Sequence, residues 1–213
     1  MQVKICGVRT PAGARACAAA GADFAGLNFV RAVRREVSEA GAAELLPLLG
    51  DTRPVAVFRD DPIDRVEGLA RGLGIRRVQL HGAETPGDCA RLREAGLTVI
   101  KALTLDDAGA LRAYAEAADV LLVDGRAPGS GRPWNYEALL QVRQDSGDPR
   151  PGQLAGAPLW LAGGLDPDNV AQAIATLRPA GVDAATGIEL EGEIDAGRVQ
   201  AFCRAARAAG GVP

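Results

Sequence analysis

Short apolar runs alternate with amphipathic stretches along almost the whole chain, and this alternation predicts strands followed by helices. Each apolar run suits a strand that is buried on both faces. The expected strands are residues 3–7, 24–29, 55–58, 77–82, 97–102, 119–124, 158–162 and 182–185. The expected helices are residues 11–20, 38–49, 62–73, 86–95, 105–117, 135–144, 167–177 and 195–209, several with a clear start signal such as Thr10-Pro11 or Ser38.

Eight strands that alternate with eight helices predict a (β/α)8 TIM barrel, an α/β fold, built as a single domain over residues 1–213. The Gly-, Pro- and Asp-rich stretch 145–157 is expected to be an irregular surface insertion rather than a linker. A doubly wound open sheet is the alternative. It lacks support, because no Gly-x-Gly-x-x-Gly follows the first strand and no acidic residue ends the second.

Composition excludes several classes of partner. The formal net charge is −3, so the chain offers no strongly basic character for nucleic acid. No apolar run approaches the ~18 residues that a membrane span requires. The N-terminus also lacks the pattern of a secretory signal. We therefore expect neither nucleic acid nor membrane as a partner, and a cytoplasmic location.

The cysteines and the single histidine argue against a metal site. Cys6, Cys17, Cys89 and Cys203 lie far apart without a Cys-x-x-Cys pair, and His81 is the only histidine. This spacing indicates neither a zinc cluster nor a disulfide framework. Cys17 and Cys203 fall in Ala-rich helical stretches and read as buried apolar residues. Cys6 has the same inert interpretation, and only its position at a strand end argues otherwise.

Functional groups of a (β/α)8 barrel gather at the carboxyl ends of its strands. The predicted strands place a small set of residues there, and its chemistry suits acid–base rather than redox catalysis. The set comprises Cys6, the loop 29–38 with Arg31, Arg34 and Arg35, His81, Asp124, Gly163-Gly164 and Thr186-Gly187.

Glycine turns follow the seventh and eighth strands. Gly163-Gly164 would let the backbone approach a ligand closely, and Thr186-Gly187 could direct N–H groups and a hydroxyl at the same point. These two strand ends form the recurrent phosphate site of the fold. One Gly-Gly pair alone more often marks a turn, but the combination predicts a phosphorylated small-molecule substrate.

Several motifs along the whole chain resemble the phosphoribosylanthranilate isomerase family of tryptophan biosynthesis. The resemblance rests on Lys4-Ile5-Cys6-Gly7, Val78-Gln79-Leu80-His81-Gly82, Leu121-Leu122-Val123-Asp124, Gly129-Ser130-Gly131, Leu161-Ala162-Gly163-Gly164-Leu165, and Asp183 with Gly187-Ile188-Glu189. It implies an Amadori rearrangement of N-(5-phosphoribosyl)anthranilate with Cys6 as general base and Asp124 as general acid. It also implies that no metal or organic cofactor is required, and we expect a monomer or homodimer.

The resemblance assigns further roles, each with a structural alternative. Arg35 would hold the anthranilate carboxylate, although Arg34-Arg35-Glu36 alone reads as a solvated charge run. His81 would line the pocket, with a structural role as the alternative. Lys4 points to the same side of its strand as Cys6. It could favour the thiolate, be solvated at the barrel's end, or pair with Asp183.

The chain also departs from the family pattern. Ala185-Thr186 replaces two serines near the expected phosphate site, Trp134-Asn135-Tyr136 follows a shortened loop after the sixth strand, and Gly192-Glu193-Ile194-Asp195 differs before the last helix. Two other interpretations stay open. One is another phosphosugar barrel isomerase, for example of histidine biosynthesis, whose first-strand aspartate is here Cys6. The other is a non-catalytic barrel subunit, which would be expected to lack Cys6 or Asp124.

Overall fold

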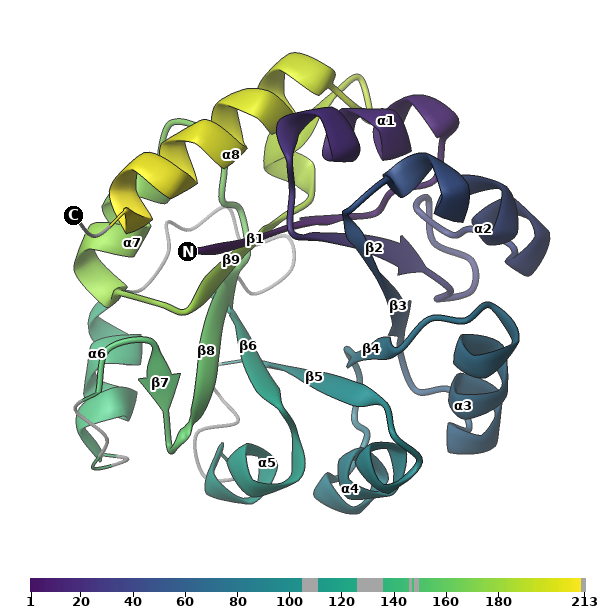
Figure 1. Ribbon diagram of the computed structural model, residues 1–213. Helices are drawn as coiled ribbons and strands as arrows, with labels where there is room; N and C mark the ends of the chain where they lie inside the picture. The colour runs from purple at the N-terminus through teal and green to yellow at the C-terminus, as the bar shows by residue number, and fades with distance from the viewer. Residues whose placement is uncertain (105–110, 126–135, 146, 148–149, 212–213) are drawn as a thin grey trace.

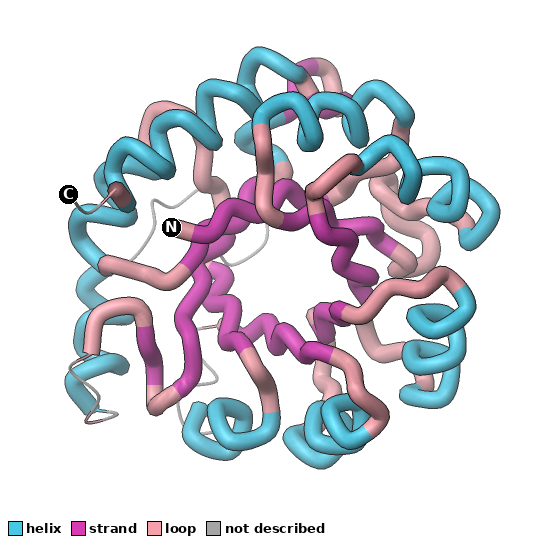
Figure 2. Tube along the Cα trace, viewed as in Figure 1, coloured by secondary structure: helices cyan, strands magenta, loops and turns pink. Residues whose placement is uncertain are grey.

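The computed structural model describes residues 1–104, 111–125, 136–145, 147 and 150–211, and shows a closed parallel barrel surrounded by helices (Figure 1). Figure 2 shows the strands as an inner ring and the helices outside it. The order around the barrel is β1-β2-β3-β4-β5-β6-β8-β9, and β9 pairs with β1 to close it. The pairing β6–β8 joins the two halves. The predicted (β/α)8 fold is confirmed.

The barrel strands lie close to the apolar runs that predicted them. They are β1 (Gln2–Cys6), β2 (Phe24–Asn28), β3 (Arg53–Phe58), β4 (Arg77–Leu80), β5 (Thr98–Leu103), β6 (Val120–Asp124), β8 (Ala157–Ala162) and β9 (Gly181–Ala184). The helices are α1 (Pro11–Ala20), α2 (Glu39–Leu45), α3 (Ile63–Gly72), α4 (Pro86–Glu94), α5 (Leu111–Ala117), α6 (Tyr136–Asp145), α7 (Val170–Leu177) and α8 (Ala196–Gly210).

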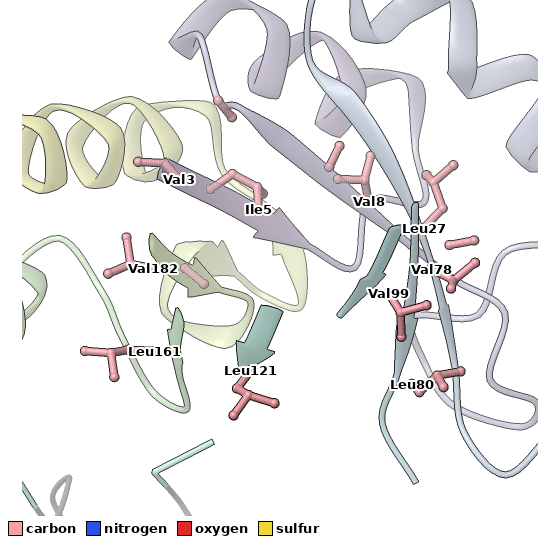
Figure 3. Packing of buried hydrophobic residues seen from close by; sticks show 14 of the residues in the cluster. Val3, Ile5, Val8, Leu27, Val78, Leu80, Val99, Leu121, Leu161 and Val182 are labelled. Atoms are coloured by element: carbon pink, nitrogen blue, oxygen red, sulfur yellow. The ribbon is translucent and has the colours of Figure 1, made fainter. Parts of the chain in front are cut away.

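Side-chain alternation along the strands produces two apolar layers. One layer lies between strands and helices and includes Val3, Ile5, Leu27 and Val78, which are labelled in Figure 3. The second cluster takes the other side chains of the same strands and is built around Phe24, Val55, Ile100, Leu122 and Trp160, with Phe24 packed against Trp160 at 5.0 Å between ring centroids. This second cluster fills the barrel interior, so packed apolar side chains lie directly beneath the carboxyl-end face of the barrel.

Several helix ends follow the predicted start and stop signals. Thr10 and Ser38 accept hydrogen bonds from Gly13 N and Gly41 N, and Asp195 does the same for α8. Gly21 ends α1 in the left-handed conformation with φ 65°. The ends of these helices are therefore determined by residues at or next to the helix termini.

Three expected elements need correction. The helix expected from residue 167 begins at Val170, and residues 167–169 form a turn in which Asp166 Oδ1 accepts the N–H groups of Asp168 and Asn169. The helix over 38–49 ends at Leu45 and continues as the 3₁₀ turn η1 (Leu46–Leu49), where Pro47 lacks the N–H that an α-helix would use.

The third correction concerns the loops. Within the expected insertion 145–157, β7 (Gln153–Leu154) pairs antiparallel with β8. A second hairpin that the sequence did not predict, β10 (Glu189–Leu190) with β11 (Glu193–Ile194), follows the 3₁₀ turn η3 (Thr186–Ile188). The motif 129–131 and the expected helix starts at 105 and 135 lie outside the described residues. None of the helices in the described ranges is long and apolar enough to cross a membrane.

Candidate active site

A cavity of about 450 Å³ lies at the carboxyl ends of the barrel strands. Its wall collects residues from most of the strand ends, which parallel strands bring to one face. The residues that line it are Cys6, Asn28, Val30, Val33, Arg34, Arg35, Val57, Arg59, Gln79, His81, Asp124, Ala162, Gly163, Gly164, Asp183, Ala185 and Thr186. Most of the residues singled out from the sequence therefore meet in one place.

Lys4, Cys6 and Asp183 form a cluster at the bottom of this cavity. Lys4 Nζ lies 2.9 Å from Asp183 Oδ2, and both side chains are buried. The two residues are register partners across β1 and β9. Cys6, two residues beyond Lys4, points to the same side and is partly exposed to the cavity. Of the three alternatives for Lys4, the solvated one is wrong.

Gly26 on β2 makes room for this cluster. A Cβ atom at Gly26 would lie 2.9 Å from Cys6 Sγ and 3.2 Å from Lys4 Nζ, so any larger residue would push the two apart or outward. The same contacts show that the Cys6 thiol and the Lys4 ammonium both pack against β2 at Gly26.

Burial and charge act in opposite directions on these groups. Burial raises the pKa of Cys6 above its ordinary 9.0, while the Lys4 ammonium opposes that rise. Burial alone would lower the pKa of Lys4, but Asp183 and Cys6 raise it above 10.5. Lys4 is thus a permanent cation beside a thiol that rests in its neutral form. Asp183 Oδ1 is buried and has no hydrogen-bond partner among the described residues.

Asp124 and His81 lie next to each other on the cavity wall. His81 Nε2 lies 3.9 Å from Asp124 Oδ2, and both side chains are partly exposed. Gln79 Nε2 lies 3.0 Å from His81 Nδ1, and with the amide in this orientation it donates to Nδ1 and leaves the N–H on Nε2, toward Asp124. Burial lowers the pKa of His81 below 6.5, with the Asp124 carboxylate opposing the shift. His81 is therefore a neutral hydrogen-bond donor at neutral pH.

A second buried ion pair supports the segment that carries His81. Lys101 Nζ on β5 lies 2.8 Å from Glu84 Oε2, and both side chains are almost fully buried. The Glu84 carboxylate also accepts the N–H groups of Gly82 and Asp60, at 2.9 and 2.8 Å. These bonds fix the turn that directly follows His81.

Arg35 does not lie in a solvated charge run. Its Nε and Nη2 atoms donate to Glu189 Oε1 and Oε2 at 2.7 and 3.0 Å, in a two-bonded arrangement. The side chain crosses Gly7, where a Cβ atom would lie only 2.3 Å from Arg35 Cδ. The hydrogen bonds to Glu189 raise the pKa of Arg35 above its usual value.

The two expected glycine turns follow β8 and β9. Gly163 and Gly164 have φ values of 93° and 69°, a conformation that favours glycine, and both line the cavity. Thr186 lines it as well. Gly187 is not among the lining residues that the structure describes. A Cβ atom there would meet Leu165 O at 2.1 Å, so Gly187 allows η3 to pack against Leu165 and Asp166, which follow the Gly163-Gly164 turn.

Several contributors to the site were not predicted from the sequence. Gln79 sits two residues before His81, so strand periodicity could have placed both side chains on one face. Glu84 and Lys101 could have been noticed as charges beside strand ends. Nothing local marks Glu189 as the partner of Arg35, because 154 residues separate them along the chain.

A (β/α)8 barrel with a thiol, a carboxylate, an imidazole and glycine turns around one carboxyl-end cavity belongs to the class of barrel proteins with acid–base sites. Residues 3–205 match the family model of N-(5'-phosphoribosyl)anthranilate (PRA) isomerase, and the chain belongs to this family.

Individual relatives agree over nearly their full length. The N-(5'-phosphoribosyl)anthranilate isomerase of Symbiobacterium thermophilum is 37% identical, with 97% of this chain and 98% of that protein covered. The crystal structure of TrpF from Jonesia denitrificans matches with a TM-score of 0.84 at 31% identity, covering 98% of both chains. A phosphoribosylanthranilate isomerase solved with reduced 1-(o-carboxyphenylamino)-1-deoxyribulose 5-phosphate matches with a TM-score of 0.81 at 28% identity, covering 98% of this chain and 99% of the other.

Proposed function

We propose that this protein converts N-(5-phosphoribosyl)anthranilate to 1-(2-carboxyphenylamino)-1-deoxyribulose 5-phosphate in tryptophan biosynthesis. Family membership over residues 3–205 supports the reaction. The observation that carries the proposal to individual residues is the placement of Cys6 and Asp124 on the wall of one cavity with both glycine turns. The proposed enzyme acts as a single barrel domain in the cytoplasm, as a monomer or homodimer, without a metal or organic cofactor.

Ring opening is the first proposed step, with Asp124 as general acid. Its carboxyl group would give a proton to the furanose ring oxygen as the C1–O bond breaks. The anthranilate nitrogen supplies its electron pair to C1 and forms a protonated Schiff base. His81 directs its Nε2–H toward Asp124 from 3.9 Å, beyond hydrogen-bond distance, so it would act on the carboxyl group as a nearby polar neighbour.

Proton abstraction follows, with Cys6 as general base. The thiolate would remove the proton from C2, and the electron pair of that bond would neutralise the Schiff base to give an enolamine. Tautomerisation to the ketone returns a proton to C1, so no oxidant or reductant is needed. The positive charge of the Lys4 ammonium would stabilise the thiolate, which burial alone disfavours. The ion pair with Asp183 holds that ammonium next to Cys6.

The two ends of the substrate would be held on separate walls. The backbone of Gly163, Gly164 and the Thr186 segment is proposed to bind the phosphate, since close backbone approach and N–H groups suit an anion. Ala185 offers no hydroxyl there, so Thr186 carries that contact alone within the pair. Arg35 is proposed to bind the anthranilate carboxylate.

A steady-state assay tests the proposal. Phosphoribosylanthranilate is generated in situ, and its conversion is followed by the loss of fluorescence on addition of the purified protein. Turnover that depends on Cys6 supports the proposal. Turnover only of the aminoaldose substrate of histidine biosynthesis would favour the other phosphosugar isomerase, and no turnover of either would favour a non-catalytic barrel.

A further inference from the structure

Glu189 binds two arginines at the rim of the cavity. Its Oε1 accepts from Arg35 Nε at 2.7 Å, and its Oε2 accepts from Arg35 Nη2 at 3.0 Å and from Arg34 Nη2 at 2.5 Å. The glutamate side chain is only 6% exposed, whereas Arg34 is 48% exposed. A carboxylate this buried and this well satisfied differs from an ordinary surface ion pair, which contributes little.

The pairing leaves one edge of the Arg35 guanidinium for another anion. Nε and Nη2 form the lateral edge of the planar group, and Glu189 occupies that edge. The terminal edge, made of Nη1 and the second N–H of Nη2, has the spacing of a carboxylate. Arg35 lines the cavity, so a substrate carboxylate could dock on this terminal edge while Glu189 stays in place.

Glu189 also offsets the electrostatic repulsion between the guanidinium groups of Arg34 and Arg35. Two arginines and one carboxylate leave a net charge of +1, which still attracts a single carboxylate. Burial alone would raise the pKa of Glu189, but the hydrogen bonds from Arg35 and Arg34 lower it below 4.5, so the anion persists at neutral pH. Without that anion the two neighbouring cations would repel, and the Arg35 side chain would lose its anchor.

Glu189, the residue that anchors Arg35, lies outside the barrel strands. Glu189 begins the β10–β11 hairpin, whose turn is also held by Arg34 through the carbonyl oxygen of Gly192. The loop 29–38 and the hairpin are thereby joined across the rim. Gly7 gives the Arg35 stem its path beneath them.

We propose that Glu189 is a positioning residue that aims the terminal edge of Arg35 at the substrate, and so determines the selectivity for substrates that carry the aromatic carboxylate. The inference rests on the proposed function. It goes beyond it by assigning this selectivity to a residue that does not itself contact the substrate.

The test measures the affinity of two ligands for matched variants. One ligand is reduced 1-(o-carboxyphenylamino)-1-deoxyribulose 5-phosphate, and the other is its phenylamino counterpart without the carboxylate. Glu189→Gln keeps the side-chain volume and removes the charge. Glu193→Gln is the matched control, because Glu193 lies on the same hairpin and pairs with Arg9 away from the cavity lining.

For Glu189→Gln we expect the Kd of the carboxylate ligand to rise about tenfold or more, as for a weakened hydrogen bond to a charged group. The Kd of the phenylamino ligand should change less than about twofold. Glu193→Gln should alter neither. In an Arg35→Ala background, Glu189→Gln should add no further loss, which a double-mutant cycle measures.

Equal weakening of both ligands by Glu189→Gln would overturn the proposal, since a hairpin that merely collapses affects the whole cavity. Unchanged binding of the carboxylate ligand would overturn it as well. Failure of the proposed function is separately visible: the wild-type protein would then show no turnover of phosphoribosylanthranilate and no preference for the carboxylate ligand.

Discussion

The ammonium of Lys4 lies 2.9 Å from the carboxylate of Asp183, and this buried pair places a fixed positive charge beside the Cys6 thiol. The partners come from β1 and β9, the two strands that close the barrel. The electrostatics of the proposed base therefore depend on barrel closure, and Lys4 serves both the fold and the thiol.

Lys4→Met should shift the pH dependence of kcat/KM. A general base works when deprotonated, so kcat/KM should rise with pH through the pKa of Cys6, which burial has already raised above 9.0. Because Lys4 lowers that pKa, its removal should move the inflection upward by about one unit or more. The measurement is a pH–rate profile of both proteins.

Lys4→Met also leaves Asp183 buried without its cation, which could unfold the barrel. The double variant Lys4→Met/Asp183→Asn removes both charges and is the control for folding. An inflection that stays at the wild-type pH in a folded Lys4→Met protein would show that Lys4 does not tune the thiol, whereas the double variant also removes Asp183, which raises the pKa of Cys6.

Cys6→Ser should retain the fold and lose nearly all turnover. A serine hydroxyl is close in size to the thiol but has a far higher pKa, so it cannot accept the C2 proton. The measurement is kcat/KM alongside the melting temperature. Near wild-type kcat/KM in this variant would remove the thiol from the proposed mechanism.

Much of this architecture could be predicted because short stretches of the sequence determine it. The apolar runs defined the strands, and caps such as Thr10 and Ser38 defined helix starts. Once the strands are parallel and closed, Cys6 and Asp124 must share one face of the barrel. Helix α7 shows the limit of local signals, since Pro167 resembles a helix start and the regular helix begins three residues later at Val170, after the turn bound by Asp166.

Long-range pairing was harder to foresee. Arg35 has an unremarkable local context, and its partner Glu189 becomes visible only when the last βα loop folds back over the second. Gly26 likewise reads as a neutral strand residue until β1 places Cys6 and Lys4 against it. Such contacts depend on barrel register and side-chain direction, which short sequence windows do not contain.

Glu84→Gln should destabilise the protein by about 3 kcal/mol or more, because it leaves the Lys101 ammonium buried without its anion. Of the two backbone N–H groups bound by the carboxylate, those of Asp60 and Gly82, one would also lose its acceptor, because glutamine has a single oxygen. Urea unfolding measures the free energy of unfolding. Glu67→Gln is the control, since Glu67 pairs with Arg71 on the surface of α3 and should cost less than about 1 kcal/mol. Similar losses for both variants would contradict a special role of the buried pair.

Asp124→Asn separates proton delivery from packing. Asparagine keeps the size of the side chain and a polar oxygen near His81, but it has no acidic proton for the ring oxygen. If Asp124 is the general acid, kcat should fall by about 10²-fold or more while ligand affinity and melting temperature change little. If the carboxylate is purely structural, the variant should lose stability and the folded enzyme should turn over normally.

The residual activities of the Asp124 and Cys6 variants should also rank in a definite order. The glycosylamine can open in solution, so part of the substrate reaches the Schiff base without help from Asp124. Removal of the C2 proton has no comparable route in solution and needs a base on the protein, so the loss of the Cys6 thiol is not bypassed in this way. Asp124→Asn should therefore retain more activity than Cys6→Ser in parallel assays at one pH. The reverse order would count against this assignment of acid and base.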